Sequence, residues 1–272
     1  MRRHGKSHPP FPRDVVTTYH DGPLGRIRSR SVGLPRPGVP EVVLVQGMAV
    51  ADYLLPGLGA LAEWTRAHLV ELPGFAGSGE PPHELTVPEF AAAVREWLTH
   101  RNLGRVILAG HSSGTQVAAE AAVGRCDVLG VVLASPTIDP AARGLPRLFV
   151  RWRVDALRES PGLATSHRPE WRRAGIRRLA HLVRAHLNHT IEEPVSRLTV
   201  PLLVIRGRDD TISTARWGLR LAALAPVGEY VEVDGAHTFP WRDPHAWSPA
   251  MRSFAIRLAN YRPESCRPKP EG

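Results

Sequence analysis

The segment from residue 105 to residue 122 constrains the fold of this chain more than any other part of it. Residues 105–109 (RVILA) form a short, apolar, β-branched run that predicts a buried strand, and residues 115–122 (TQVAAEAA) favour a helix. Between them lies GHSSG, residues 110–114. Its glycines lack Cβ atoms, so the strand and the helix can approach each other closely. A Gly-x-Ser-x-Gly turn in this setting holds its serine, here Ser112, in a strained backbone conformation.

The rest of the chain alternates between predicted strands and predicted helices. An antiparallel hairpin is expected over residues 15–32, with its turn at Asp21 and Gly22. Helices are expected at residues 86–98, where Thr86 and Glu89 form a capping box, and from Ser248 onward. A buried strand is expected at residues 41–45, and further strands are expected at residues 68–71, 129–134, 202–205 and 229–233. This alternation predicts an α/β fold with a mostly parallel central sheet and helices on both faces.

Residues 140–198 interrupt the alternation, because this stretch contains helical patterns and no predicted strand. Ile176, Leu179, Leu182 and Leu187 recur at helical spacing, and arginines occupy the other faces. We therefore expect a helical cap inserted into the α/β core. The predicted organisation is a disordered basic tail at 1–13, a core at 14–139 and 199–261, the cap at 140–198, and a second disordered tail at 262–272.

The charge of the chain comes almost entirely from arginine. The formal net charge is +9, and among the 35 basic residues only Lys6 and Lys269 are lysines. Since no nucleic-acid-binding module is visible, we interpret this as compositional bias and expect no nucleic-acid partner, with an anionic partner or substrate as the alternative. No apolar run is long enough for a signal peptide or a membrane span, so a cytoplasmic protein is expected. The oligomeric state stays open.

Four further motifs accompany the turn at residues 110–114, and together they give the chain a recognisable pattern. They are VLVQG at residues 43–47, LPGFAGSG at residues 72–79, GRDD at residues 207–210 and GAH at residues 235–237. Over residues 14–261 the chain resembles the α/β-hydrolase superfamily, and most closely its capped bacterial serine hydrolases of the esterase and lipase type. The resemblance implies an α/β-hydrolase fold with a catalytic triad in the order Ser112, Asp210, His237.

The chemistry of acyl transfer explains why these three residue types are needed. A serine hydroxyl is a poor nucleophile at neutral pH, so a neutral histidine must take its proton, and a carboxylate must orient that histidine. His245 is the alternative to His237 as the base. Asp139, which follows an earlier strand, and Asp209 are the alternatives to Asp210.

Other residues are expected to support the triad or to lie outside it. The resemblance implies an oxyanion hole made by the backbone N–H groups of Met48 and Ser113. The chain departs from the family's pattern at Gln46, where histidine is common, and also at Glu71 and Ala76, which are interpreted as scaffold residues. The histidines of the expected cap are predicted to be surface residues: His181, His186 and His189.

These observations predict a serine hydrolase without a cofactor or metal ion, acting on a small-molecule acyl substrate. It would cleave a carboxylic ester, lactone or thioester through an acyl-enzyme on Ser112. Hydrolysis of a C–C bond and acyl transfer to another acceptor remain alternatives, because the same triad supports them. A ligand-binding protein that keeps the fold without catalysis is the alternative from a different class. The sequence contains no metal-ligand cluster, phosphate-binding loop or dinucleotide fingerprint.

Overall fold

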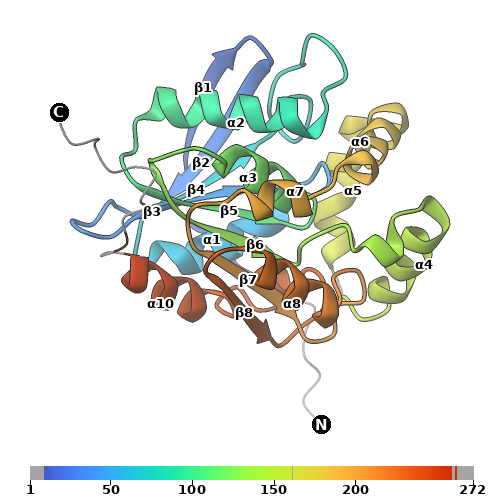
Figure 1. Cartoon of the computed structure of the whole chain (residues 1–272). Coiled ribbons are helices and arrows are strands. Elements are labelled where there is room, and N and C mark those ends of the chain that lie inside the picture. Colours follow the sequence, from blue (N-terminus) through green and yellow to red (C-terminus); the bar gives the residue numbers. More distant parts are fainter. Residues whose placement is uncertain (1–8, 161, 259–260, 262–272) are drawn as a thin grey trace, which may run out of the picture.

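One eight-stranded sheet forms the centre of the molecule (Figure 1). The structure is a computed structural model, and it describes residues 9–160, 162–258 and 261. The strand order is β1-β2-β4-β3-β5-β6-β7-β8. The pairs β1–β2 and β2–β4 are antiparallel, and every neighbouring pair from β4–β3 to β7–β8 is parallel. The predicted mostly parallel sheet is confirmed. The strands are β1 Val16–Gly22, β2 Gly25–Val32, β3 Glu41–Val45, β4 Ala67–Glu71, β5 Val106–His111, β6 Val128–Ala134, β7 Leu202–Gly207 and β8 Gly228–Val233.

Helices follow most of the strands. The predicted helix after β4 is α2, and its capping box between Thr86 and Glu89 is present. Helix α1 was not predicted, because its two glycines lower the helix propensity. It is nevertheless helical and largely buried, and a Cβ on its Gly57 would lie 2.7 Å from the Trp247 ring. The helices are α1 Leu55–Ala62, α2 Val87–Arg101, α3 Gly114–Ala122, α4 Leu145–Ala156, α5 Leu163–Ala174, α6 Ile176–Asn188, α7 Glu192–Ser196, α8 Ala215–Leu224, α9 Phe239–Arg242 and α10 Ser248–Leu258, with short 3-10 turns η1 Asp52–Leu54 and η2 Pro140–Ala142.

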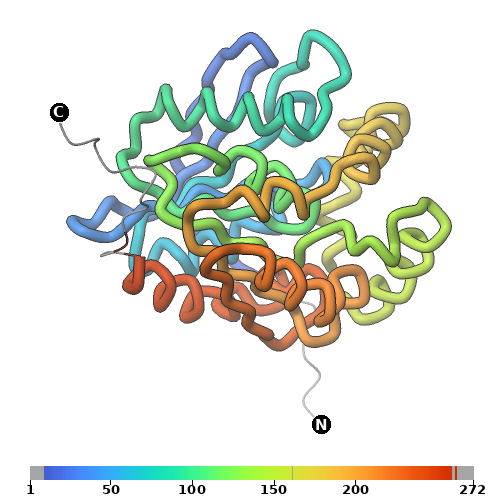
Figure 2. Tube along the Cα trace, viewed as in Figure 1, coloured from blue at the N-terminus to red at the C-terminus, as the bar shows by residue number. Residues whose placement is uncertain are grey.

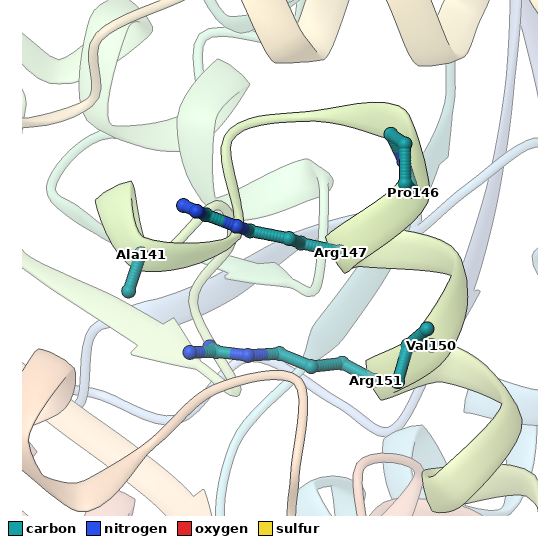
Figure 3. Close-up of a pocket in the computed structure, with 5 residues that line it drawn as sticks. All are labelled: Ala141, Pro146, Arg147, Val150 and Arg151. Atoms are coloured by element: carbon teal, nitrogen blue, oxygen red, sulfur yellow. The ribbon is translucent and has the colours of Figure 1, made fainter.

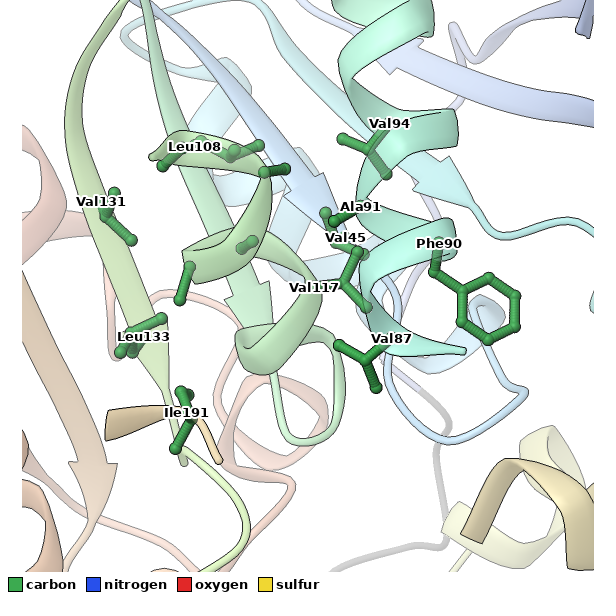
Figure 4. Packing of buried hydrophobic residues seen from close by; sticks show 14 of the residues in the cluster. Val45, Val87, Phe90, Ala91, Val94, Leu108, Val117, Val131, Leu133 and Ile191 are labelled. Carbon is green, nitrogen blue, oxygen red and sulfur yellow. The ribbon is translucent and has the colours of Figure 1, made fainter. Parts of the chain in front are cut away.

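Two hydrophobic layers hold the helices against the sheet. On one face, α2 and α3 pack against strand residues such as Val45, Leu108 and Val131 (Figure 4). Buried residues of α8 belong to the same layer. On the other face, α1 and α10 pack against strand residues such as Val42 and Ile107. Successive side chains of a strand point to opposite faces, so each central strand contributes to both layers. The sheet is therefore covered on both sides, as its continuous apolar strands predicted.

Between β6 and β7 the chain runs through η2 and four consecutive helices, α4 to α7. Helices α4, α5 and α6 gather at the right-hand edge of the molecule in Figure 1, and the tube in Figure 2 shows the same grouping. In α6, Leu182 is 1% exposed and packs into the core, whereas Ile176 at the start of the helix is 84% exposed. Ile176 therefore does not continue the buried stripe that the helical spacing predicted.

The two expected tails fall mostly outside the described residues. Residues 1–8 and 262–272 are not described. Residues 9–13 form neither helix nor strand, but the ring of Pro12 lies against α1, where a Cβ on Gly59 would be 3.5 Å from it.

Candidate active site

The turn between β5 and α3 gives Ser112 an unusual backbone conformation. Its φ is +54°, in the left-handed region that residues with a Cβ rarely occupy. A Cβ on Gly110 would lie 2.3 Å from the carbonyl oxygen of Gly114, and a Cβ on Gly114 would lie 2.2 Å from that of Gln46. Glycine is therefore required at both positions. The tight turn leaves Ser112 partly exposed although the residues on each side of it, His111 and Ser113, are buried.

The structure brings Ser112, His237 and Asp210 together, although they come from three separate loops. His237 Nε2 lies 2.8 Å from Ser112 Oγ, and His237 Nδ1 lies 2.9 Å from Asp210 Oδ2. Asp210 follows β7, and its Oδ1 accepts hydrogen bonds of 2.8 Å from the backbone N–H groups of Ile212 and Ser213. His237 follows β8. The three side chains thus form one continuous hydrogen-bonded chain with the order that acyl transfer requires.

Burial and neighbouring charge have opposing effects on the pKa values of Asp210 and His237. Burial of Asp210 by itself would raise its pKa, but the charge of His237 and the hydrogen bonds from His237 and Ser213 hold that pKa below its ordinary value. Burial of His237 by itself would lower its pKa, but the charge and hydrogen bond of Asp210, together with the charges of Asp155 and Glu159, outweigh burial and raise the pKa to about 9. Asp210 is therefore ionised at neutral pH and can stabilise a positively charged imidazole.

None of the alternative residues reaches Ser112 or His237 in the same way. Asp139 Oδ2 accepts hydrogen bonds from Arg151 Nη1 at 2.7 Å and from Thr214 Oγ1 at 3.0 Å. Figure 3 shows Arg151 extending from α4 beside η2, in a surface hollow that also contains Arg147. Asp209 is exposed, and its backbone carbonyl accepts a hydrogen bond from Arg158.

His245, the alternative base, lies at the surface. Its side chain is 64% exposed, and its Nδ1 is 3.7 Å from Glu63 Oε1. The geometry thus leaves His237 as the histidine that contacts both a buried carboxylate and the serine of the turn.

The loop after β3 passes directly beside Ser112. A Cβ on Gly47 would lie 3.5 Å from Ser112 Cβ and 2.5 Å from the hydroxyl of Tyr53, so only glycine fits there. Met48 follows, and its carbonyl accepts a hydrogen bond of 3.0 Å from Trp171 Nε1 of α5. Among the described residues, neither Met48 nor Ser113 donates its backbone N–H in any backbone hydrogen bond of the turns, loops or helix caps. Both are therefore available for a ligand at Ser112.

Comparison with known proteins identifies the family of this chain. The sequence model of the Alpha/beta hydrolase family matches residues 42–250. The chain belongs to this family. A comparison with curated proteins by sequence finds no significant match.

Several solved structures share the fold of this family member. The bromoperoxidase from Bacillus anthracis has a TM-score of 0.73 and 16% identity, over 89% of this chain and 100% of that one. The enol-lactonase from Burkholderia xenovorans LB400 has a TM-score of 0.68 and 20% identity, over 88% and 100%. A thermophilic esterase from Thermogutta terrifontis has a TM-score of 0.64 and 22% identity, over 91% and 100%. At these identities the likeness concerns the fold.

The three departures from the family's pattern have different structural settings. Glu71 is buried, and its Oε2 accepts hydrogen bonds from Arg28 Nε at 2.7 Å and from the backbone N–H of Gly77 at 2.8 Å, which makes it part of the scaffold. Ala76 has a φ of +50°, a conformation that favours glycine. Gln46 is fully buried, and neither atom of its side-chain amide has a hydrogen-bond partner within the described residues.

The prediction for the histidines of residues 140–198 is wrong for His186. This side chain is 1% exposed, and its Nδ1 lies 2.6 Å from Gln116 Oε1 of α3. Burial lowers the pKa of His186 to about 3, so the ring is neutral. Its spacing of four from the buried Leu182 was the available signal, because residues four apart share one helix face.

Sequence analysis also missed a group of buried side chains around His237. His111 Nε2 donates to the carbonyl oxygen of His237 at 2.9 Å, and its Nδ1 accepts from the hydroxyl of Tyr53 at 2.6 Å. Tyr53 and His111 therefore hold the backbone of His237 in place through two consecutive hydrogen bonds. Tyr53 also lies against His167 of α5, with ring centroids 4.9 Å apart. These contacts join segments far apart in the sequence and leave no local pattern.

The described residues contain no group of three or more His, Cys, Asp or Glu side chains placed to bind a metal ion. No helix in the same part of the chain has the length and apolar character needed to cross a membrane.

Proposed function

We propose that this chain is a serine hydrolase that needs no cofactor and cleaves a carboxylic ester, lactone or thioester through an acyl-enzyme on Ser112. The observation that carries the proposal is the continuous hydrogen-bonded chain from Ser112 Oγ through His237 to Asp210. In this reading the three residues are a catalytic triad.

The reaction proceeds in two balanced halves. Ser112 Oγ attacks the carbonyl carbon of the substrate while its proton passes to His237 Nε2, which lies 2.8 Å away. The tetrahedral intermediate collapses, and the leaving alcohol or thiol takes that proton from His237. Water then gives a proton to His237 and attacks the acyl-enzyme, which releases the acid and returns the proton to Ser112. Asp210 holds the imidazole in place and stabilises its positive charge in both halves.

The backbone N–H groups of Met48 and Ser113 form the oxyanion hole in this proposal. Two features support the assignment: Gly47 brings the loop beside Ser112, and Ser113 is the N-cap residue of α3, whose N-terminus favours negative charge. Trp171 bonds the carbonyl of Met48 and so restrains the loop.

Residues 140–198 act as a cap over this site. Trp171 reaches Met48, and Glu170 Oε2 accepts a hydrogen bond of 2.8 Å from the backbone N–H of Ala51, so α5 is fastened to the proposed oxyanion loop. Substrate choice is then set by the side chains that α5 brings to Ser112. The names of the similar enol-lactonase and esterase support an ester or lactone as the substrate class.

A fluorophosphonate probe tests the proposal directly. It is expected to phosphonylate Ser112 with loss of fluoride, because only an activated serine reacts with such a probe. Mass spectrometry of peptides locates the adduct, and heat-denatured protein is the control that should not react. An adduct on another residue, or no adduct on folded protein, contradicts the proposal.

Activity is expected to rise with pH and to reach half of its plateau in the alkaline range. The reason is that the pKa of His237 is raised to about 9, whereas an ordinary histidine has a pKa of about 6.5. Only neutral His237 accepts the proton of Ser112, and a raised pKa keeps it protonated through neutral pH. The measurement is kcat/KM for a stable ester across a pH series, corrected for spontaneous hydrolysis. An optimum at acidic pH with loss above neutrality is the outcome that rejects this role.

Replacement of Gln46 by alanine is expected to leave kcat within about tenfold of the wild-type value. The proposed oxyanion donors are backbone groups, whereas removal of a true donor costs roughly 10²- to 10³-fold. A matched Gln46→Met variant keeps the side-chain volume and removes a buried, unpartnered amide, so its thermal stability should not fall. A loss of 10²-fold or more in kcat in both folded variants means that the Gln46 amide itself takes part.

A further inference from the structure

The end of α4 and the residues just after it carry two carboxylates that the proposed reaction does not use. Asp155 is 2% exposed, and Glu159 is partly buried. Each of them accepts a hydrogen bond from the residue that immediately follows a member of the proposed triad. Asp155 accepts from Thr211, which follows Asp210, and Glu159 accepts from Thr238, which follows His237. Carboxylates are rarely buried unless they are paired, so this arrangement requires a reason.

The contacts fasten α4 to both loops of the triad. Asp155 Oδ1 accepts from the backbone N–H of Thr211 at 3.1 Å, and the Thr211 hydroxyl donates to the carbonyl of Arg151 at 3.1 Å. Glu159 Oε1 accepts from the backbone N–H of Thr238 at 2.7 Å, and its Oε2 accepts from the Thr238 hydroxyl. Hydrogen bonds to a charged acceptor are stronger than neutral ones, so both loops are held by strong bonds.

We propose that Asp155 and Glu159 are positioning residues, which tie α4 to the loops of Asp210 and His237 and whose negative charge sets the pH range in which the enzyme works. This inference rests on the proposed function, because it assigns His237 as the base. It goes beyond the triad, since neither carboxylate touches Ser112 or His237 in the contacts described.

The charged groups that face His237 from the surrounding elements are negative, and the histidines beside it are neutral. His111 and His167 are neutral, because burial lowers their pKa values to about 3 and about 4. Burial raises the pKa of Glu159 to about 7, so Glu159 is ionised in the alkaline range where His237 titrates. Besides Asp210, the negative charges of Asp155 and Glu159 therefore favour protonated His237. The groups facing His237 are Asp210 after β7, Asp155 and Glu159 at the end of α4, His111 in β5 and His167 in α5.

Removal of one of these charges should shift the activity profile in a direction that a structural defect does not produce. Glu159→Gln keeps an oxygen that can accept from Thr238 and removes the charge. The alkaline rise in kcat/KM should then move toward lower pH by about one unit, the low end of the effect of a close opposite charge. At pH 8 this corresponds to a gain on the order of fivefold in the neutral fraction of His237. Asp155→Asn should move the profile in the same direction.

Two control variants separate charge from tethering. Asp234→Asn removes a carboxylate from the loop that also carries His237, but Asp234 is 87% exposed and pairs with Arg208, so solvent screens it and the profile should stay in place. Glu159→Ala removes both the charge and the hydrogen bonds to Thr238. It should show the same shift together with a lower kcat, because the loop of His237 loses its anchor.

Titration of the His237 imidazole by proton NMR tests the inference without turnover. It is measured in folded Ser112→Ala protein with and without Glu159→Gln and, separately, Asp155→Asn. A fall in the His237 midpoint of about one unit in either variant supports the inference even if no ester is hydrolysed, in which case only the proposed function fails. If neither the NMR midpoint nor the kcat/KM profile moves in either folded variant, the inference is overturned.

Discussion

Ser112→Ala is expected to abolish ester turnover, with a loss of kcat on the order of 10⁴-fold or more, while the protein stays folded. Alanine removes the only atom that can form the acyl-enzyme, and the residual rate then comes from the oxyanion hole and substrate binding alone. The fold should tolerate the change, because the φ of +54° at this position is set by the turn and alanine has the same Cβ as serine.

A panel of p-nitrophenyl esters of increasing acyl length provides the measurement. The wild-type protein identifies the best acyl chain, and Ser112→Ala is then compared on that substrate, with thermal unfolding as the control for folding. Ser113→Ala is the matched neighbour: it changes a hydroxyl one residue away and keeps the backbone N–H, so most of the activity should remain. Turnover in Ser112→Ala comparable to that of wild type refutes the acyl-enzyme on this residue.

Asp210→Asn is expected to reduce kcat on the order of 10⁴-fold, the cost of losing the orienting acid in such a triad. The amide of asparagine cannot stabilise protonated His237, and it allows the wrong tautomer of the imidazole. The backbone N–H groups of Ile212 and Ser213 can still be satisfied by the amide oxygen, so the loop should keep its shape.

The two other aspartates considered for this role are the matched controls. Asp209→Asn changes an exposed side chain and should leave kcat nearly unchanged. Asp139→Asn removes the ion pair with Arg151, so it should lower thermal stability more than activity. An inactive Asp139→Asn variant beside an active Asp210→Asn variant places the acid after β6 and refutes the assignment.

Sequence patterns were sufficient where a local stretch carries its own physical cause. The capping box of α2 is an example, because Thr86 and Glu89 satisfy each other within one turn. Helix α1 is the opposite case: its glycines argue against a helix, and burial against Trp247 and the sheet overrides that preference. The surface position expected for His186 was wrong for the same reason, since its partner Gln116 lies seventy residues away in the sequence.

The sequence by itself determined the strand, turn and helix around Ser112 and the order of the three residues proposed for catalysis, because glycine spacing and apolar periodicity act over a few residues. Only the tertiary structure decided which aspartate faces His237 and which pairs with an arginine. It also decided that Tyr53 and His111 support the backbone of His237, and that Asp155 and Glu159 fasten α4 to the loops of Asp210 and His237. Such contacts join residues that are distant along the chain. They depend on how the helices pack, and burial then sets the strength of each charge.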